Sequence, residues 1–336
     1  MRYFILLILT LIPAFALGQE WEEEARFGNE GAQSTLRVIS STDTSFFAPV
    51  IETFVAKSPS VAISYFVTST AELNRIVREK PSGYDVVISS AMDLQLKLAN
   101  DGFAKELTVD GLPDWAKWRS SLFAFTTEPA AIVMNKKAFP DGRIPQTRQE
   151  LIQAIRDRPE EFSGRIGTYD VRDSGLGYLF ATQDARASET YWRLTEVMGS
   201  LKARLYCCSS AMIDDLVTGE LAVAYNVLGS YAKARQDTSD QLQIVLPSDF
   251  PTTMMRTALV SAQSSQPQIA EDFVQHLISL QTGSTDNNMP LPPLDVENAV
   301  TGRSNIALEP ALMTYLDRLK RRNFLKEWES AIIQGQ

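Results

Sequence analysis

Three short apolar segments, each followed by a loop of Ser and Thr and then by a helical pattern, occur early in this chain. The apolar segments cover residues 36–39, 61–67 and 85–88. The helical segments that follow carry apolar side chains at spacings of three and four. Strands that alternate with helices are typical of βαβ units with a parallel sheet, so the sequence predicts an α/β fold.

The second half of the chain repeats this alternation, which indicates a second α/β lobe. We expect the chain to cross between lobes at residues 123–129 and to return to lobe 1 at residue 240. The predicted fold has two α/β lobes, a hinge, an interlobe cleft and a helical C-terminal tail. Its expected parts are a polar leader at residues 21–34, lobe 1 at residues 34–126 plus 240–285, lobe 2 at residues 127–239, and C-terminal helices at residues 304–336 that pack on the lobes.

The three Ser/Thr loops supply candidate ligand contacts. Parallel strands end at the same edge of a sheet, and ligands bind beyond the carboxyl ends of such strands. Ser and Thr are also ordinary helix caps, so one loop is weak evidence, whereas three on one edge bring hydroxyl and N–H groups together. The candidates in lobe 1 are Ser41, Thr42, Ser69, Thr70, Ser89 and Ser90.

A run of small residues in the second half predicts the opposite wall of the cleft. Ser174 and Gly175 open a helix directly after a strand, where exposed N–H groups and the helix dipole favour an anion. The same run is equally common as a turn and cap. Arginine is the expected countercharge, because its guanidinium pairs with carboxylate or phosphate through two hydrogen bonds. The other candidates are Thr126, Arg172, Tyr225, Asn226, Arg256 and Asp170, which, like Asp43, is alternatively a helix cap.

The charge balance disfavours several functions. The chain has 32 Lys and Arg against 41 Asp and Glu, a net charge of −9, which is unfavourable for sequence-independent binding of DNA or RNA. We therefore expect no nucleic-acid partner. One histidine and two cysteines leave few ligands for a zinc or copper site, so we expect no metal and no cofactor. Nothing in the sequence indicates an oligomer, and we expect a monomer.

Residues 1–18 have the three parts of a secretory signal peptide. Arg2 supplies a short positive region, residues 3–12 are apolar, and a small-residue cleavage signal follows at residues 14–16. The apolar run is too short to span about 30 Å of hydrocarbon. We therefore expect this segment to be cleaved and the mature protein to be exported to the bacterial periplasm.

Export permits disulfides, and the two cysteines of the chain, Cys207 and Cys208, are adjacent. Consecutive Cα atoms lie about 3.8 Å apart, below the usual disulfide range, so a bridge between them is strained. Two small buried thiols and a vicinal disulfide both stay open. A cysteine nucleophile would need a base, and His276 is the one histidine in the sequence. Since no Gly-x-Ser-x-Gly or His-Glu-x-x-His run is present, we do not expect an enzyme.

The order of several motifs resembles that of a known family. The motifs are Tyr84-Asp85-Val86-Val87-Ile88-Ser89-Ser90, Phe125-Thr126-Thr127-Glu128-Pro129, Gly167-Thr168-Tyr169-Asp170 and Ser174-Gly175-Leu176-Gly177. Over about residues 34–330 the chain resembles the type II periplasmic solute-binding proteins of ABC importers. It is most similar to the branch with ferric-iron-binding and sugar-phosphate-binding members.

This resemblance implies two lobes that close over a small solute. The expected partners are a small anionic solute, phosphorylated or carboxylated, and an inner-membrane ABC permease. Alternatively, the same scaffold presents its ligand to a sensor histidine kinase. The iron-binding members hold Fe(III) through adjacent tyrosines, whereas the matching strand here has Tyr225 followed by Asn226, so iron is disfavoured. We expect His276 at the edge of the core rather than in a site.

Overall fold

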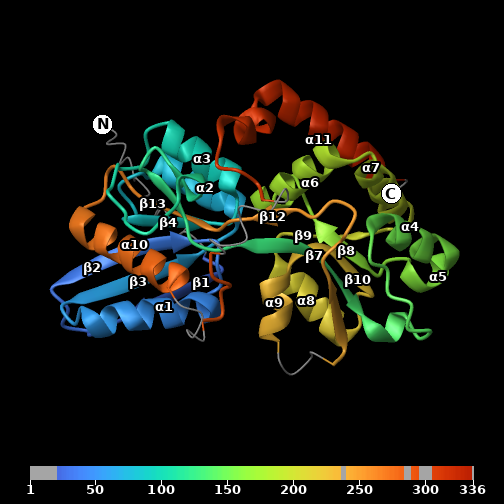
Figure 1. The fold of residues 1–336 in the computed structure, drawn as a ribbon, viewed down its shortest axis with the longest axis horizontal. Helices are drawn as coiled ribbons and strands as arrows, with labels where there is room; N and C mark the ends of the chain where they lie inside the picture. Colours follow the sequence, from blue (N-terminus) through green and yellow to red (C-terminus); the bar gives the residue numbers. More distant parts are fainter. Residues whose placement is uncertain (1–20, 236–239, 284–288, 295–304, 335–336) are drawn as a thin grey trace, which may run out of the picture.

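Two β-sheets, one in each half of the molecule, divide the chain into two lobes (Figure 1). The computed structural model describes residues 21–235, 240–283, 289–294 and 305–334. The expected signal peptide lies outside these residues. Within them both lobes and a helical C-terminal region are present, so the predicted two-lobe α/β architecture is confirmed.

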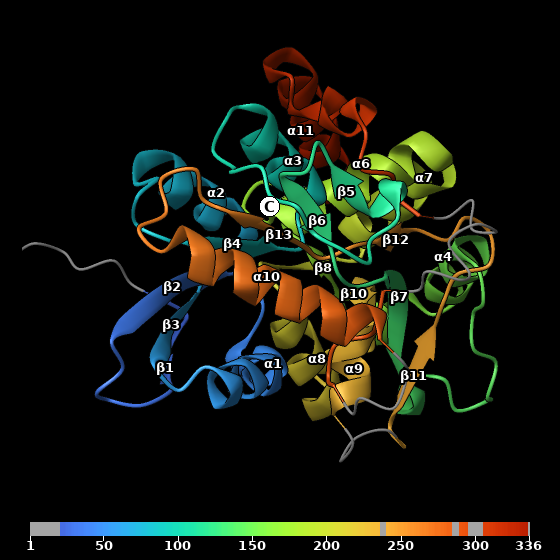
Figure 2. The ribbon, with the colours of Figure 1, turned by 60° about the vertical axis from the view of Figure 1, so that its left-hand side comes forward.

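Lobe 1 contains the sheet with the order β1-β3-β2-β4-β13-β6-β5. β2 runs parallel to both β3 and β4, as the alternating pattern predicts. Figure 2 shows α10 crossing in front of this lobe beside α1. The elements are β1 (Glu23–Phe27), β2 (Ser34–Ser40), α1 (Thr44–Lys57), β3 (Val61–Val67), α2 (Thr70–Glu79), β4 (Val86–Ser89), α3 (Met92–Asn100), η1 (Asp114–Ala116), β5 (Lys117–Trp118), β6 (Leu122–Ala124), β13 (Thr257–Val260) and α10 (Pro267–Thr282).

Apolar spacing and capping explain the helices of this lobe. The apolar face of α1, which includes Phe47 and Phe54, is buried. Leu73 is likewise one of the buried residues of α2. α2 begins where it does because the Ser69 hydroxyl accepts a hydrogen bond from the Glu72 N–H at 3.3 Å. Such a cap contributes about 1 kcal/mol.

Lobe 2 is built on the sheet β11-β7-β10-β8-β9, in which β8 runs parallel to β9 and β10. β10 and β7 are antiparallel, and their register shifts between Ala224 and Val227. The elements are β7 (Glu128–Asn135), η2 (Lys136–Ala138), α4 (Arg148–Asp157), α5 (Pro159–Phe162), β8 (Ile166–Tyr169), α6 (Gly175–Ala187), α7 (Thr190–Ser200), β9 (Arg204–Tyr206), α8 (Ser209–Thr218), β10 (Val223–Leu228), α9 (Gly229–Ala234) and β11 (Leu242–Val245).

The prediction of a polar leader at residues 21–34 is wrong, because part of this segment forms the strand β1. This strand pairs antiparallel with β3, from Glu23 opposite Val67 to Phe27 opposite Ile63. Its sequence is mostly polar, and it lies at the edge of the sheet. Pairing with a neighbour stabilises such a strand, so its own hydrophobic pattern could not reveal it.

Two antiparallel segments connect the lobes. β7 leads out of lobe 1, and β12 (Thr253–Met254) pairs with its first residues, Met254 opposite Glu128 and Thr253 opposite Pro129. β11 pairs with β7 inside the lobe 2 sheet. The chain therefore returns to lobe 1 after β11, later than the predicted residue 240.

The C-terminal region contacts both lobes. η5 (Pro310–Leu316) packs on α3 of lobe 1, and α11 (Arg318–Ile332) packs on α7 of lobe 2. Figure 1 shows α11 at the top of the molecule, above α6 and α7. The Tyr178 hydroxyl of α6 donates a hydrogen bond to the Tyr315 carbonyl at 2.6 Å. The tail thus bridges the lobes on the side of α6.

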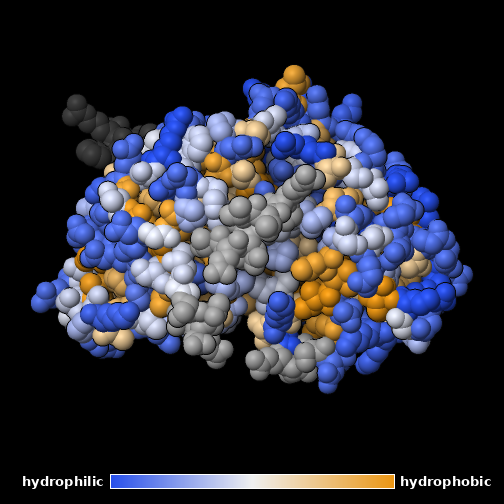
Figure 3. Space-filling view, in the orientation of Figure 1, coloured by the Kyte–Doolittle hydropathy of each residue, from blue (hydrophilic) through white to orange (hydrophobic). Residues whose placement is uncertain are grey.

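The apolar core also crosses between the lobes. The larger buried cluster includes Phe47 and Ile88 of lobe 1 and continues to Leu176 and Met212 of lobe 2. The face shown in Figure 3 is mainly hydrophilic, with apolar side chains gathered low on the lobe 2 side. Among the helices of the described residues, none combines the length and the apolar character needed to cross a membrane.

Candidate functional site

The carboxyl ends of β2, β3 and β4 lie together on the side of lobe 1 that faces lobe 2. The Ser41 hydroxyl lies 3.4 Å from the Ser90 hydroxyl and accepts a hydrogen bond from the Ser90 N–H at 3.2 Å. Ser89 accepts from the Ala91 N–H at 3.2 Å, at the start of α3. The three Ser/Thr loops therefore share one edge, as the parallel strand order predicts.

The N-terminal end of α6 in lobe 2 contacts the N-terminal end of α2 in lobe 1. Ser174 caps α6, and the Leu176 N–H donates across the interface to the Thr70 hydroxyl at 3.1 Å. A Cβ atom on Gly175 would lie 2.7 Å from the Leu94 Cδ1 and 2.9 Å from the Thr70 hydroxyl. The glycine therefore permits this close approach of the two lobes.

A buried ion pair lies at the hinge between the lobes. Arg256 donates from Nε to Glu128 Oε1 at 2.8 Å and from Nη2 to Oε2 at 3.1 Å. Its Nη1 donates to the Thr42 hydroxyl of lobe 1 at 2.6 Å. Thr126 donates to Glu128 and accepts from the Arg256 N–H, and Ser230 of lobe 2 donates to Glu128 at 2.7 Å. This network joins both lobes to the hinge.

Both members of this pair are held in their charged forms. Burial alone would raise the pKa of Glu128, but the adjacent Arg256 guanidinium lowers it below the ordinary value. Burial opposes the charge of Arg256, yet the Glu128 carboxylate raises the pKa of Arg256 above its usual value. The positive charge of Arg256 is therefore balanced by Glu128.

A second interlobe contact joins α1 to α9. Tyr231 donates to the Asp43 carboxylate at 3.0 Å, and its ring stacks on Phe46 with 4.3 Å between centroids. Burial raises the pKa of Asp43, the Tyr231 hydrogen bond lowers it, and the nearby Glu23 carboxylate raises it, with a net increase. The opening beside α1 is thus acidic.

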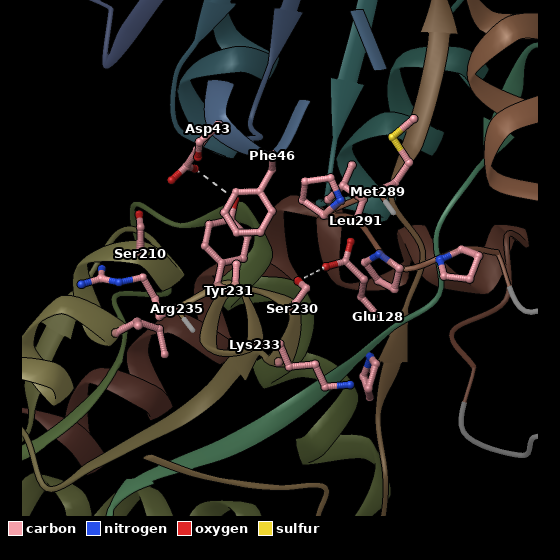
Figure 4. A pocket seen from close by; sticks show the side chains of 18 of the residues that line it. Asp43, Phe46, Glu128, Ser210, Ser230, Tyr231, Lys233, Arg235, Met289 and Leu291 are labelled. Carbon is pink, nitrogen blue, oxygen red and sulfur yellow. Dashed lines mark hydrogen bonds between the residues drawn. The ribbon is translucent and has the colours of Figure 1, made fainter. Parts of the chain in front are cut away.

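A cavity of about 1040 Å³ lies between the lobes beside this contact (Figure 4). Its volume is in the range of small-molecule sites. Asp43 and Tyr231 line it with Glu128, Ser230 and Ser210, and apolar side chains such as Met289 and Leu291 complete the wall. Lys233 contributes a cation. Gln281 also lines the cavity, and its buried Nε2 has no hydrogen-bond partner among the described residues.

The fourteen predicted site residues divide into two groups. None of them is among the residues that line the cavity. Thr126 and Arg256 donate to Glu128 in its wall, and Thr42 accepts a hydrogen bond from Arg256. Those that the structure brings to the facing edges of the lobes and the hinge are Ser41, Thr42, Ser69, Thr70, Ser89, Ser90, Thr126, Ser174, Gly175 and Arg256.

Arg172 and Asp170 are not brought to these edges. The two side chains pair with each other, with Nε of Arg172 at 2.8 Å from Oδ1 of Asp170. Arg172 also approaches Glu329 at 3.9 Å and the Trp328 ring at 6.0 Å, so it faces α11. Asp170 accepts the Arg172 N–H at 3.0 Å. Asp170 therefore closes a local turn, and the alternative role of helix cap is wrong, because Ser174 caps α6.

Tyr225 and Asn226 point into the interior of lobe 2. Both donate to Oδ2 of the buried Asp184, at 2.7 and 2.8 Å. The register shift in β10 and the left-handed φ of 62° at Asn226 mark a bulge, which turns these side chains away from the cleft. Arg148 completes this network, with Nη2 at 3.3 Å from Asp184.

The residues that sequence reasoning missed are Glu128, Tyr231 and Lys233. Glu128 lies in the predicted crossover, where a carboxylate entering a buried strand signals a paired charge. Tyr231 and Lys233 lie on α9, which begins at Gly229 directly after the end of β10. Because ligand contacts often follow the end of a strand, the position of Tyr231 and Lys233 after β10 could have identified them as candidate site residues.

The described residues offer little for metal or nucleophile chemistry. No group of three or more His, Cys, Asp or Glu side chains in this part of the chain could hold a metal ion. His276 lies on α10 with Nε2 at 2.9 Å from the Thr53 hydroxyl of α1. Burial and the charge of Lys57 lower the pKa of His276. It is a lobe 1 residue at the edge of the core, as predicted, and is not a partner for the lobe 2 thiols.

Comparison with known proteins decides the family. Residues 67–283 match the model of the bacterial extracellular solute-binding proteins. The chain belongs to this family. It is also 31% identical to the substrate-binding protein of an ABC transporter from Agrobacterium tumefaciens, over 92% of this chain and 98% of that one, with a TM-score of 0.84. Members of this family are solute-binding proteins, and the Agrobacterium relative binds the substrate of an ABC transporter.

More distant solved structures share the type II periplasmic-binding fold. The periplasmic binding protein AfuA from Actinobacillus pleuropneumoniae, with fructose-6-phosphate bound, is 13% identical over 90% of this chain and all of that chain, with a TM-score of 0.71. Iron-bound HitA from Pseudomonas aeruginosa is 14% identical over 89% of this chain and 99% of that chain, with a TM-score of 0.63. No match was found among curated protein sequences.

Proposed function

We propose that this solute-binding protein captures a small anionic solute, phosphorylated or carboxylated, between its lobes in the periplasm and delivers it to an ABC permease. The supporting observation is that the N-terminal ends of α2 and α6, from opposite lobes, meet at the bond between Thr70 and Leu176. Helix N-termini present N–H donors and positive partial charge, which favour phosphate or carboxylate. Lys233 adds a positive charge to the wall of the interlobe cavity.

The carboxylates at the same opening support a solute that also carries hydroxyl groups. Asp43 and Glu128 line the cavity, and Arg256 is already balanced by Glu128. A bare anion is repelled by these carboxylates, whereas hydroxyl groups can donate hydrogen bonds to them. A phosphorylated or carboxylated hydroxy compound therefore fits better than inorganic phosphate.

Solute binding requires the contacts between the lobes to open and to close again. Opening breaks the Thr70–Leu176 and Tyr231–Asp43 hydrogen bonds and exposes the helix ends. Closure over the solute forms these bonds again and adds solute contacts to both lobes, so the solute favours the closed form. The family assignment supports a permease as the partner that recognises this form, rather than a histidine kinase.

Isothermal titration calorimetry with matched compounds tests this proposal. The mature protein is titrated with phosphoglycerate and glycerate, with hexose phosphate and hexose, with inorganic phosphate, and with Fe(III) carbonate. We expect binding of a phosphorylated or carboxylated hydroxy compound, and none of the uncharged hexose or Fe(III). Binding of hexose alone, or of Fe(III) alone, would contradict the proposal.

A further inference from the structure

The two cysteines lie at the start of α8, on the lobe 2 side of the interlobe opening. Cys207 is exposed and Cys208 is half-buried, so the alternative of two buried thiols is wrong. Their sulfur atoms lie 2.8 Å apart. This separation is only about 0.8 Å longer than a disulfide bond of about 2.05 Å. Adjacent, solvent-accessible sulfur atoms in contact can be joined with a small movement.

The surroundings of the pair favour a reactive thiolate at Cys208. This residue is the N-cap of α8, where the helix dipole stabilises negative charge. The hydrogen bond from Cys207 lowers the pKa of Cys208 to about 7, burial opposes this, and the Ala211 N–H lowers it further. The same hydrogen bond raises the pKa of Cys207, and burial adds to the increase. Cys208 therefore ionises more readily than an ordinary cysteine, whereas Cys207 holds its proton more tightly.

Contacts around the pair connect it to both lobes. The Glu22 carboxylate of lobe 1 is close enough to raise the pKa of both thiols. Ser209, the next residue, accepts the Leu228 N–H at 3.2 Å and lies 2.6 Å from the Tyr169 hydroxyl. These bonds tie the first turn of α8 to the ends of β8 and β10. A change in the backbone at the cysteines is therefore transmitted to strand ends that face the cleft.

We propose that Cys207 and Cys208 form a reversible vicinal disulfide, and that its formation rearranges the N-terminal turn of α8 beside the interlobe cavity. The oxidant is a disulfide-bonded compound or protein. The Cys208 thiolate attacks one sulfur of that disulfide and releases the other as a thiolate. Cys207 then loses its proton and attacks the Cys208 sulfur, which releases the second thiolate. The two cysteines lose two electrons and two protons in total, and the oxidant is reduced to two thiols.

Reversibility follows from the adjacency of the two residues. A ring closed between neighbouring residues is strained, because their Cα atoms are closer than in ordinary disulfides. Strained and exposed disulfides are reduced more readily than structural ones. Because Ser210 lines the cavity and follows in the same turn, the redox state also changes the cavity wall. Any effect on solute affinity rests on the proposed function, whereas disulfide formation does not.

Oxidation of the mature protein by glutathione disulfide tests the proposal. After quenching with acid and alkylation with iodoacetamide, intact mass spectrometry should show both cysteines protected together, with the loss of two hydrogens and no glutathione adduct. Dithiothreitol should restore both thiols. The Cys207→Ser variant is the matched control, because it keeps Cys208 and should accumulate the mixed disulfide with glutathione.

The structural part is tested by hydrogen exchange of the solute-free protein. Oxidation should change exchange in the first turn of α8 and at the Leu228 amide, and the double variant Cys207→Ser, Cys208→Ser should show no redox dependence. A stable glutathione adduct on the wild type, a disulfide-linked dimer, or thiols that stay free while Cys207→Ser reacts would overturn the disulfide. Unchanged exchange after complete oxidation would overturn its coupling to α8.

Discussion

Two buried arginine–carboxylate pairs differ in what they connect. Arg148 and Asp184 lie inside lobe 2, with both side chains fully buried and their partners drawn from lobe 2 and the segment that follows it. Arg256 and Glu128 are equally buried, but their partners come from both lobes, since Thr42 belongs to lobe 1. The same chemistry therefore stabilises one lobe in the first case and connects the two lobes in the second.

This difference indicates which buried charges can respond to a solute. Movement of one lobe against the other leaves the Arg148 network intact, because its members move together. The same movement changes the distances around Arg256 and Glu128. We therefore expect changes in the first network to affect folding, and changes in the second to affect folding, lobe closure and solute affinity together.

The largest effect is expected for Asp184→Ala. This change leaves the buried Arg148 with Asp249 as its carboxylate partner among the described residues, and it leaves Tyr225 and Asn226 without their acceptor. The loss of the buried pair and of these bonds should cost about 3–5 kcal/mol of unfolding free energy. Urea denaturation measures the loss, and calorimetry with the phosphorylated compound that binds the wild type should give nearly unchanged affinity for the folded fraction. A large loss of affinity without a loss of stability would contradict the assignment of this network to folding.

Glu128→Gln should have a smaller effect on stability and a larger one on closure. The amide keeps the shape of the side chain but leaves the Arg256 charge unbalanced, which should cost about 2 kcal/mol. Urea denaturation checks this value. The same variant should alter the small-angle scattering profile, whereas Asp184→Asn, the matched change in lobe 2, should not. Identical profiles for both variants would remove the distinction between the two pairs.

The dependence of stability on pH should separate Glu128 from Asp43. Because Arg256 lowers the pKa of Glu128, its contribution is present above the unfolded pKa and is lost as the pH falls through the lower folded pKa. Burial raises the pKa of Asp43, so its effect at neutral pH is destabilising and is relieved as the pH falls through that raised value.

Urea denaturation at a series of pH values measures these two contributions. Glu128→Gln should make the unfolding free energy fall less in acid. Asp43→Asn should remove the gain in unfolding free energy that the wild type shows as the pH falls through the raised pKa of Asp43. If the unfolding free energy changed with pH in the same way for the wild type and both variants, neither carboxyl group would have the assigned pKa shift.

Gly175→Ala should act on the interlobe contact alone. The added methyl group meets Leu94 and Thr70 of lobe 1, so it should hold the lobes apart and weaken solute binding by about tenfold, or about 1.4 kcal/mol. Scattering should show a larger radius of gyration. Gly31→Ala is the matched control, because nothing lies within 4 Å of the added methyl group. Equal behaviour of the two variants would argue against the close approach at Gly175.

The smallest effect is expected for Tyr231→Phe. It removes the hydrogen bond to Asp43 and keeps the stacking on Phe46. A neutral donor to a partly accessible carboxylate contributes about 1 kcal/mol, so solute affinity should change by only a few fold. Calorimetry measures the change, and an effect larger than that of Gly175→Ala would reverse the order proposed for the interlobe contacts.

The sequence predicted what depends on local pattern. The Ser/Thr loops follow strands whose periodicity is clear, and parallel strands end at one edge, so Ser41 and Ser90 were expected near each other. The edge strand β1 was missed because its sequence is polar. Tyr225 was placed in the cleft by its position near a strand end, but a bulge turns it inward.

Ion pairs between residues far apart in the sequence could not be predicted from local sequence patterns. Arg256 and Glu128 are 128 positions apart, and only the folded hinge brings them together. Arg256 was predicted as a free countercharge, but its partner could not be found from spacing. Arg172 was expected in the cleft because it follows a strand, yet the packing of α11 provides it with Glu329 and Trp328.

Small-angle scattering of the mature protein, with and without a saturating phosphorylated compound that calorimetry shows to bind, tests the central claim most directly. If the solute is held between the lobes by both of them, the radius of gyration should fall on binding, and Gly175→Ala should reduce this fall. Identical profiles with and without the bound compound, for the wild type, would contradict binding by lobe closure.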